Sequence, residues 1–266
     1  MAVIHATGLA KRYAGRQESA LKGVDVDLHE GRVLGILGSN GAGKTTLVRL
    51  LTTLSKPTSG TATVCGFDVT THGDQVRERI ALVGQFAAVD EVLSGRANLV
   101  LFGRLRGLRR RAAKERATDL LERMDLTGAA DQAVKDYSGG MRRKLDLAVA
   151  LVTDPEVLFV DEPTTGLDPI ARRALWDLVR QLVVGGRSVV LTTQYLEEAD
   201  ALADDIVILR DGVVIASGTS ADLKRLAGPP RTVTLEPTLE EVYLRLHSDP
   251  EADPEADPEA STGASA

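Results

Sequence analysis

Apolar and polar residues alternate along the chain in two periods, and their succession predicts strands interleaved with helices. Eight short runs are either continuously apolar or apolar at about every second position, which is typical of β-strands. These runs are VDVDL (24–28), VLGIL (33–37), ATVCGFDV (62–69), IALVG (80–84), VLFV (157–160), SVVLTT (188–193), DIVIL (205–209) and VVIAS (213–217). Residues 62–69 are expected to form an edge strand or a hairpin, and Asp211-Gly212 is expected to close a hairpin between the last two runs.

Helical periodicity dominates residues 94–151, between the fourth and fifth of these runs. RAAKERATDLLERM (111–124) is predicted to be helical, and SGGMRRKLDLAVALV (138–152) is predicted to begin at a serine cap and to end before Asp154-Pro155. A further amphipathic helix is expected after VLGIL, because four leucines recur there at helical spacing: Leu47, Leu50, Leu51 and Leu54. This order of elements predicts an α/β fold, with a parallel sheet that carries a helical insertion.

The composition is that of an ordinary globular protein, since 43% of the 266 residues are hydrophobic and 26% are charged. A chain of this length buries enough surface to fold without a disulfide or a structural metal. The single cysteine, Cys65, has no partner in the chain, and the N-terminus lacks the features of a signal peptide, so we expect an intracellular protein. No apolar run approaches the roughly 20 residues that cross a bilayer, so we expect no membrane span.

The net charge of −6 comes from the C-terminal end of the chain. Residues 249–259 hold six of the 38 acidic residues and no base, which leaves 32 acids against 32 Lys and Arg in residues 1–248. A neutral body lacks the basic field of general nucleic-acid binding, so we expect no nucleic-acid partner. Within this body, residues 104–116 contain seven bases and one acid; they form either a solvated face or a contact with lipid headgroups or a partner.

A glycine-rich loop follows the predicted strand VLGIL and precedes the leucine-rich helix. The loop and the start of that helix consist of Gly38, Ser39, Asn40, Gly41, Ala42, Gly43, Lys44, Thr45 and Thr46. Glycines let the backbone amides point inward at phosphate, and the helix N-terminus adds about half a positive charge. Lys44 can reach the β- and γ-phosphates, and Thr45 can ligate magnesium. A plain glycine-rich turn is the alternative, but the complete motif between the expected elements favours a P-loop.

Two adjacent acids, Asp161 and Glu162, follow the apolar run VLFV. This position places Asp161 at the carboxyl edge of an open α/β sheet, where it can hold the magnesium ion of the P-loop. Glu162 is then placed to polarise a water molecule for attack on the γ-phosphate. The alternative is a pair of acids that only ends a strand before Pro163. Together with the P-loop, the two acids predict hydrolysis rather than binding alone.

A second anion-binding helix start is predicted at YSGGMRRKLDLA (137–148). Ser138 supplies a cap and a hydroxyl, and Gly139 and Gly140 leave room for a close backbone approach. A simple kinase or GTPase needs one phosphate-binding helix start, whereas this chain has two.

With this second motif, the sequence resembles the nucleotide-binding domain of the ATP-binding cassette (ABC) family over about residues 3–226. The P-loop (38–46), the signature (137–141) and the Walker B strand (157–162) occur in the family's order. The resemblance implies the ABC ATPase fold: a P-loop NTPase core with a parallel sheet, an N-terminal antiparallel β-subdomain and an inserted α-helical subdomain. It also implies a homodimer with two sandwiched ATP molecules, in which each signature serine caps the γ-phosphate held by the other chain.

Other positions are matched through the same resemblance. Gln85 corresponds to the Q-loop glutamine, which senses magnesium and the attacking water and faces the membrane partner, and Asp168 corresponds to the D-loop carboxylate of the dimer interface. Tyr13 matches the aromatic residue that stacks on adenine, with an ordinary half-buried tyrosine as the alternative. Gln194 stands where most of the family has a histidine. Glutamine can donate a hydrogen bond to the γ-phosphate but cannot become cationic.

Four segments look most like the ATPase subunits of daunorubicin-resistance-type ABC exporters: residues 84–99, 137–148, 192–200 and 237–246. Such a subunit powers efflux of a hydrophobic drug or antibiotic through a separate transmembrane permease, at the inner face of the membrane. One alternative is a soluble ABC ATPase of translation or DNA repair, which usually has two cassettes or a long coiled coil. Another is a regulatory ATP-binding module without turnover, which would need a change at Lys44, Asp161 or Glu162.

The sequence predicts three regions. An ABC ATPase domain is expected at residues 1–226, with its helical subdomain at about 86–152. A short β/α extension is expected to follow it at residues 227–248. Residues 249–266 begin with three DPEA repeats and are predicted to be a disordered acidic tail. The tail is either a solvating extension or an acidic interaction arm.

Overall fold

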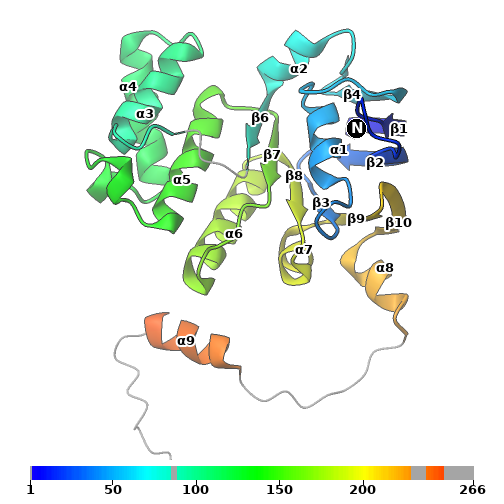
Figure 1. Cartoon of the computed structure of the whole chain (residues 1–266). Coiled ribbons are helices and arrows are strands. Elements are labelled where there is room, and N and C mark those ends of the chain that lie inside the picture. The colour runs from blue at the N-terminus through cyan, green and yellow to red at the C-terminus, as the bar shows by residue number, and fades with distance from the viewer. Residues whose placement is uncertain (1, 85–88, 229–237, 249–266) are drawn as a thin grey trace, which may run out of the picture. The chain divides into compact units, whose positions relative to one another are not determined.

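The computed structural model describes residues 2–84, 89–228 and 238–248 (Figure 1). The chain divides into two compact units, residues 1–229 and 230–266. The described part of the second unit is the helix α9 (Leu239–Ser248), and all other elements belong to the first unit. Across the described ranges, no helix is both long enough and apolar enough to span a bilayer.

The first unit is built on a six-stranded sheet with the order β10-β9-β3-β8-β7-β6. Its strands are β3 (Val33–Leu37), β6 (Ile80–Val83), β7 (Val157–Asp161), β8 (Ser188–Thr193), β9 (Asp205–Arg210) and β10 (Val213–Gly218). Neighbouring strands are parallel from β6 to β9, and β10 returns antiparallel to β9. β3, β7 and β8 are buried at every position, as expected of parallel strands that are covered on both faces. These strands and the final hairpin confirm the sequence prediction.

A second, antiparallel sheet has the order β2-β1-β4-β5. It consists of β1 (Ala2–Lys11), β2 (Leu21–His29), β4 (Ser59–Val64) and β5 (Phe67–Asp68). β4 and β5 form the hairpin predicted at residues 62–69, with β5 at the edge of the sheet. The apolar pattern did not predict β1, whose pairing with both neighbours shifts register near Gly8. The shift interrupts the strict alternation that identifies a strand in a sequence.

The helices of the first unit alternate with the strands of the larger sheet. They are α1 (Lys44–Leu51), α2 (Gly73–Arg79), α3 (Gly95–Leu105), α4 (Arg110–Arg123), α5 (Gly139–Ala150), α6 (Pro169–Val184), α7 (Leu196–Leu202) and α8 (Ser220–Arg225). α3, α4 and α5 lie between β6 and β7 in the chain and pack together to one side of the sheet (Figure 1). α5 begins at the predicted cap, Ser138, and a 3-10 turn at Leu151–Thr153 follows its end.

The helix after the glycine-rich loop, α1, is shorter than its leucine pattern predicts. Leu47, Leu50 and Leu51 are buried, but α1 ends at Leu51 and Leu54 is 62% exposed. Thr53 has a φ of 63°, a left-handed conformation that stops the helix before Leu54. The prediction that Leu54 belongs to the buried face was therefore wrong.

Two layers of buried side chains pack against the six-stranded sheet. Ile36 and Phe159 belong to the layer that contains α1 and the antiparallel sheet, whereas Leu158 and Val160 belong to the layer that contains α5 and α6. Successive residues of β7 therefore enter opposite layers, as the period of a strand requires. This packing fixes the carboxyl end of β7, where Asp161 and Glu162 lie.

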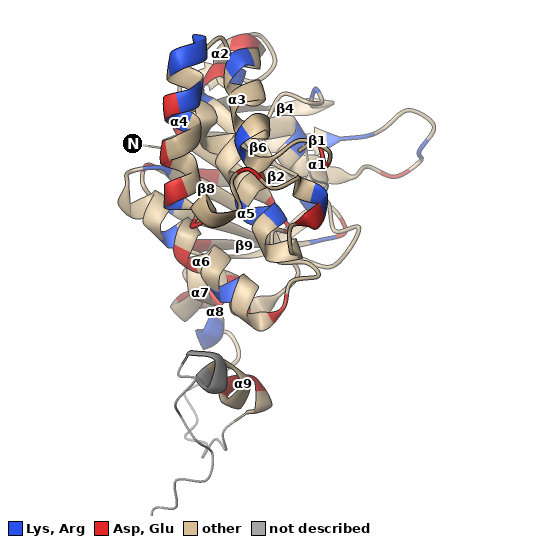
Figure 2. Cartoon of the chain, turned by 90° about the vertical axis from the view of Figure 1, so that its left-hand side faces the viewer, with Lys and Arg blue, Asp and Glu red and all other residues tan. Residues whose placement is uncertain are grey.

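Charged residues of both signs are spread over the helices of the first unit (Figure 2). In the basic stretch 104–116, Arg111 pairs with Glu115, and Arg116 pairs with Asp119 on the same helix, α4. Part of the positive charge of this stretch is therefore neutralised on α4 itself.

Candidate functional site

The glycine-rich loop joins β3 to α1 and packs closely against other backbone segments. A Cβ atom at Gly38 would lie 2.5 Å from the carbonyl oxygen of Leu209 in β9, so the loop leaves no room for a side chain there. Gly43 has a φ of 112°, and a Cβ at that position would lie 2.9 Å from the carbonyl oxygen of Ala20. These contacts require glycine at both positions. They hold the loop between β9 and the start of β2, with the N-terminus of α1 at its end.

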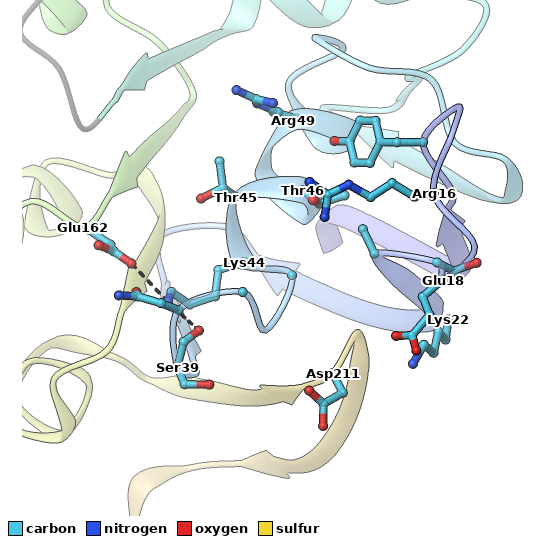
Figure 3. Close-up of a pocket in the computed structure, with 16 residues that line it drawn as sticks. Arg16, Glu18, Lys22, Ser39, Lys44, Thr45, Thr46, Arg49, Glu162 and Asp211 are labelled. Carbon is cyan, nitrogen blue, oxygen red and sulfur yellow. Dashed lines mark hydrogen bonds and ion pairs between the residues drawn. The ribbon is translucent and has the colours of Figure 1, made fainter.

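Lys44 is the first residue of α1, and its ammonium group is directed back into the loop. It donates hydrogen bonds to the carbonyl oxygens of Gly38 at 2.8 Å and Ser39 at 3.2 Å. It also forms an ion pair with Glu162, with 3.0 Å between Nζ and Oε1 (Figure 3). The side chains are 4% and 10% exposed, so this is a buried pair in which the interaction is screened little by solvent.

A cavity of about 970 Å³ opens in front of this pair. Every residue from Ser39 to Thr46 lines it except Ala42, which is buried, and Gly38 does not line it. Tyr13 lines the same cavity, so the aromatic residue selected from the sequence does lie beside the loop. Arg16 and Arg49, which the sequence reasoning missed, add positive charge to the wall (Figure 3). A pocket of this size with cationic and amide donors is suited to a nucleoside polyphosphate.

The acid Asp161 links the loop to the sheet. The Thr45 hydroxyl donates a hydrogen bond to its Oδ2 at 3.2 Å, and the Thr192 hydroxyl of β8 donates to its Oδ1. Hydroxyl and carboxylate oxygens are the ligands that Mg²⁺ prefers, and Mg²⁺ typically binds one or two such protein groups together with phosphate and water. Thr45 and Asp161 therefore fit a magnesium ion that is shared with a bound phosphate. Within the described ranges, no group of three or more His, Cys, Asp and Glu side chains is arranged to hold a metal without such a phosphate.

Glu162 adopts a backbone conformation that is rare for a residue with a side chain, with a φ of 49°. Its N–H group donates to the Thr192 hydroxyl at 3.1 Å, which anchors the turn to β8. A left-handed non-glycine residue costs about 1–3 kcal/mol and is typical of functional sites, where the surrounding structure enforces it. The turn brings the carboxylate of Glu162 to Lys44, at the edge of the cavity.

Arg143 of α5 is a further residue of the site that the sequence reasoning did not identify. Its guanidinium group donates to the carbonyl oxygens of Pro163 and Gly84, both at 2.8 Å, and of Glu162 at 3.2 Å and Asp161 at 3.3 Å. Burial lowers the pKa of Arg143, and the charges of nearby acids oppose this shift. The arginine stays cationic at neutral pH, because the pKa of a guanidinium is ordinarily above 12.

A second cavity, of about 610 Å³, also has Glu162 in its wall. Glu162 and Asn40 line both cavities, and the second is also lined by Gln194 and Gly139. The structure therefore brings Gln194 and one glycine of the signature to the same space as Glu162. Gln194 itself is exposed at the end of β8.

Ser138, Gly140 and Asp168 lie at helix N-termini rather than in the walls of these two cavities. The Ser138 hydroxyl accepts a hydrogen bond from the N–H of Met141 at 3.2 Å, and Asp168 caps α6 by accepting from the N–H of Ala171 at 2.8 Å. Within one chain, both side chains are therefore helix caps. Gln85, predicted to sense magnesium and water, lies outside the described residues.

Comparison with known proteins identifies relatives over most of the chain. The family model described as ABC transporter matches residues 21–165. The daunorubicin resistance ATP-binding protein DrrA3 of Streptomyces coeruleorubidus is 56% identical over 224 residues, which are 84% of this chain and 70% of that protein. The daunorubicin/doxorubicin resistance ATP-binding protein DrrA of Streptomyces peucetius is 52% identical over 225 residues, which are 85% of this chain and 68% of that protein.

Solved structures with a similar fold include an ATP-binding cassette in a dimeric, post-hydrolysis state bound to ADP and Pi. It is 25% identical to this chain, with a TM-score of 0.73, and the match covers 81% of this chain and 98% of that one.

Proposed function

Because the chain belongs to the ABC transporter ATP-binding family, we propose that it is the ATP-hydrolysing subunit of a two-component exporter. DrrA3 is named for resistance to daunorubicin and DrrA for resistance to daunorubicin and doxorubicin, so the proposed cargo is a hydrophobic drug or antibiotic. The names of the relatives give no support to the alternative of a soluble ABC ATPase. The observation that carries the proposal is that Lys44 and Glu162 pair in the wall of one polar cavity, where Thr45 also lies and binds Asp161 behind it.

In the proposed site, the loop amides and Lys44 bind the β- and γ-phosphates of ATP, while Tyr13 stacks on the adenine. Thr45 and Asp161 hold Mg²⁺, with Gln85 as a further expected contact. When bound, the ion neutralises charge on the phosphates and orients them. Glu162 accepts a proton from a water molecule as its oxygen attacks the γ-phosphorus, and the bond to the β-phosphate oxygen breaks to release ADP and phosphate.

Gln194 is proposed to donate a hydrogen bond to the γ-phosphate from the second cavity. A glutamine amide remains neutral, so this contact is expected to be the same at pH 6 and pH 8, unlike one made by histidine, which titrates near 6.5. The position of Gln194 beside Glu162 supports the assignment.

We further propose that two copies of the chain sandwich two ATP molecules, with Ser138, Gly139, Gly140 and Asp168 facing the partner copy. The dimer of the related cassette with ADP and Pi supports this arrangement. The exposed positions of Ser138 and Gly139 leave them accessible to a second chain. A separate transmembrane permease would then hold the dimer at the inner face of the membrane, and no nucleic acid is involved.

The proposal is tested by ATP turnover and ATP-dependent dimerisation of the purified chain, as wild type, Glu162→Gln and Gln194→Ala. Loss of a general base costs about 10²- to 10⁴-fold in rate, so Glu162→Gln is expected to turn over slowly and to form a stable dimer with ATP. Glu156→Gln is the matched control, since Glu156 lies at the opposite end of β7 and pairs with Arg79.

Three outcomes would contradict parts of this proposal. Turnover by Glu162→Gln at the wild-type rate would remove Glu162 from catalysis. A wild-type chain that binds ATP without turnover, alone and with its permease, would favour a regulatory module. An unchanged ATPase rate in Gln194→Ala would show that Gln194 makes no catalytic contact with the γ-phosphate.

A further inference from the structure

One guanidinium group binds three consecutive carbonyl groups of the turn that carries Glu162. Arg143 donates to the oxygens of Asp161, Glu162 and Pro163, at distances of 2.8 to 3.3 Å. Three successive carbonyls converge on one cation because the backbone turns sharply at Glu162, where φ is 49°. The arginine therefore stabilises the unusual turn that directs the Glu162 carboxylate toward Lys44.

The same guanidinium reaches a fourth carbonyl, that of Gly84, at 2.8 Å. Gly84 is the residue that follows β6, so Arg143 also binds the carboxyl end of that strand. The four acceptors lie at the carboxyl ends of two neighbouring strands, β6 and β7, which are separated by more than 70 residues in the sequence. One side chain thus ties the ends of both strands to α5.

The helix that supplies Arg143 begins with the signature residues. Ser138 caps α5, and Gly139 and Gly140 form its first two positions, so Arg143 lies in the second turn. In an α-helix each N–H bonds to the carbonyl four residues before it, so the signature residues and Arg143 belong to one hydrogen-bonded element. Arg143 therefore connects the helix that begins at Ser138 to the turn at Glu162.

We propose that Arg143 is a positioning residue for hydrolysis, which holds the Glu162 carboxylate in place and links it to the signature end of α5. The inference rests on the proposed role of Glu162 as the group that activates water. Lysine is not an equivalent substitute, because its ammonium is a single point of charge, whereas the guanidinium presents donors in a planar fork to several acceptors at once.

The test compares Arg143→Lys and Arg143→Gln with wild type for ATP affinity and for kcat. Misplacement of a catalytic group by about 1 Å costs up to about 10²-fold, so we expect kcat to fall by about tenfold or more. The Kd for ATP is expected to stay within about twofold, because the loop and Lys44 are unchanged, and the effect therefore lies in kcat rather than in binding.

Two controls separate positioning from a general loss of structure. Arg116→Lys is matched, since Arg116 is also a partly buried helix arginine that donates to a backbone carbonyl, that of Leu151, at 2.6 Å, but in α4. Its kcat is expected to be that of wild type. The second control places Arg143→Lys in the Glu162→Gln background, where a residue that acts through Glu162 causes no further loss of rate.

A folded Arg143→Lys chain with wild-type kcat would overturn the inference, as would an equal loss in the Glu162→Gln background. If Arg143→Gln does not fold, Arg143→Lys decides, because it keeps the charge and one hydrogen bond. If both are unstable, Arg143→Ala assayed with and without millimolar guanidinium decides. Rescue of kcat by the free cation supports positioning, and its absence contradicts it. The inference about Arg143 and the role of Glu162 are tested separately. If Glu162→Gln turns over ATP slowly while Arg143→Lys turns it over at the wild-type rate, only the inference about Arg143 is refuted.

Discussion

The two adjacent glycines of the signature differ in how closely other side chains approach them. A Cβ atom at Gly140 would lie 2.9 Å from the Cβ of Ala171 in α6, whereas a Cβ at Gly139 would meet only Leu167 Cδ2, at 3.8 Å. The first distance is a steric clash between two helices, and the second is an ordinary contact. We therefore predict that Gly140→Ala destabilises the chain and that Gly139→Ala does not.

The magnitude follows from the difference between the two variants. Carbon atoms that are not bonded to each other pack at about 3.5 Å or more, so Gly140→Ala must displace Ala171 by about 0.6 Å. Forcing an extra carbon into a packed interface costs about 1–3 kcal/mol. Both changes replace glycine by alanine in the first turn of α5, so their effects on the unfolded chain and on helix propensity nearly cancel. Gly140→Ala is thus expected to be about 1–3 kcal/mol less stable than Gly139→Ala.

Urea unfolding of both variants, followed by far-UV circular dichroism, measures this difference. With a slope of about 2 kcal/mol per molar urea, a cost of about 2 kcal/mol lowers the midpoint by about 1 M. The double variant with Gly140→Ala and Ala171→Gly should recover most of the loss, because it removes the atom that the new Cβ would meet. Equal midpoints for the two single variants, or no recovery in the double variant, would refute the assignment of Gly140 to helix packing.

Two further predictions concern groups whose titration is shifted by burial. Glu198 is fully buried, which raises its pKa although Thr193 and Trp176 bind its carboxylate. The folded chain then binds more protons than the unfolded chain, so the free energy of unfolding falls as the pH rises above about 4.3, the pKa of glutamate in the unfolded chain. Glu198→Gln is expected to flatten this pH dependence when urea unfolding is measured across pH 4–8. Burial and the nearby Glu156 raise the pKa of Cys65 to about 12, so a thiol reagent at pH 7 should label the native chain far more slowly than the urea-unfolded chain. A pH dependence of stability that Glu198→Gln leaves unchanged would contradict the first assignment. Equal labelling rates for the native and the unfolded chain would contradict the second.

The parts of the fold and site that the sequence predicted are those that one short segment specifies. The strand at 33–37 is continuously apolar, and the glycine-rich motif that follows it is recognised from its own residues. The cap at Ser138 is likewise read from its own segment. In contrast, β1 escaped prediction because its alternation is interrupted near Gly8, and α1 ended early because Thr53 adopts a left-handed conformation.

Two residues of the site that were not predicted, Thr192 and Arg143, act across long separations. Thr192 is 31 residues from Asp161, to which it donates, and Arg143 is 20 residues from Pro163. Neither a threonine in a strand nor an arginine in a helix carries a local signal that distinguishes it from an ordinary surface or core residue. Their partners become visible only when β7, β8 and α5 are brought together. Residues that support a site are therefore harder to predict than residues that form its motif.

Glu162 combines several features that are unfavourable for stability. Its backbone is left-handed, which costs about 1–3 kcal/mol, and its carboxylate is only 10% exposed. Its ion pair with Lys44 does not offset this, since a buried pair contributes little net stability compared with apolar residues of similar size. Two neighbours nevertheless hold it there: the Thr192 hydroxyl accepts a hydrogen bond from the Glu162 N–H, and the Arg143 guanidinium donates one to the Glu162 carbonyl oxygen. A residue that adopts an unfavourable conformation, and is held in it by contacts from two other segments, is typical of a functional position. The conformation of Glu162 and the contacts that hold it therefore support its proposed role in hydrolysis, independently of the relatives.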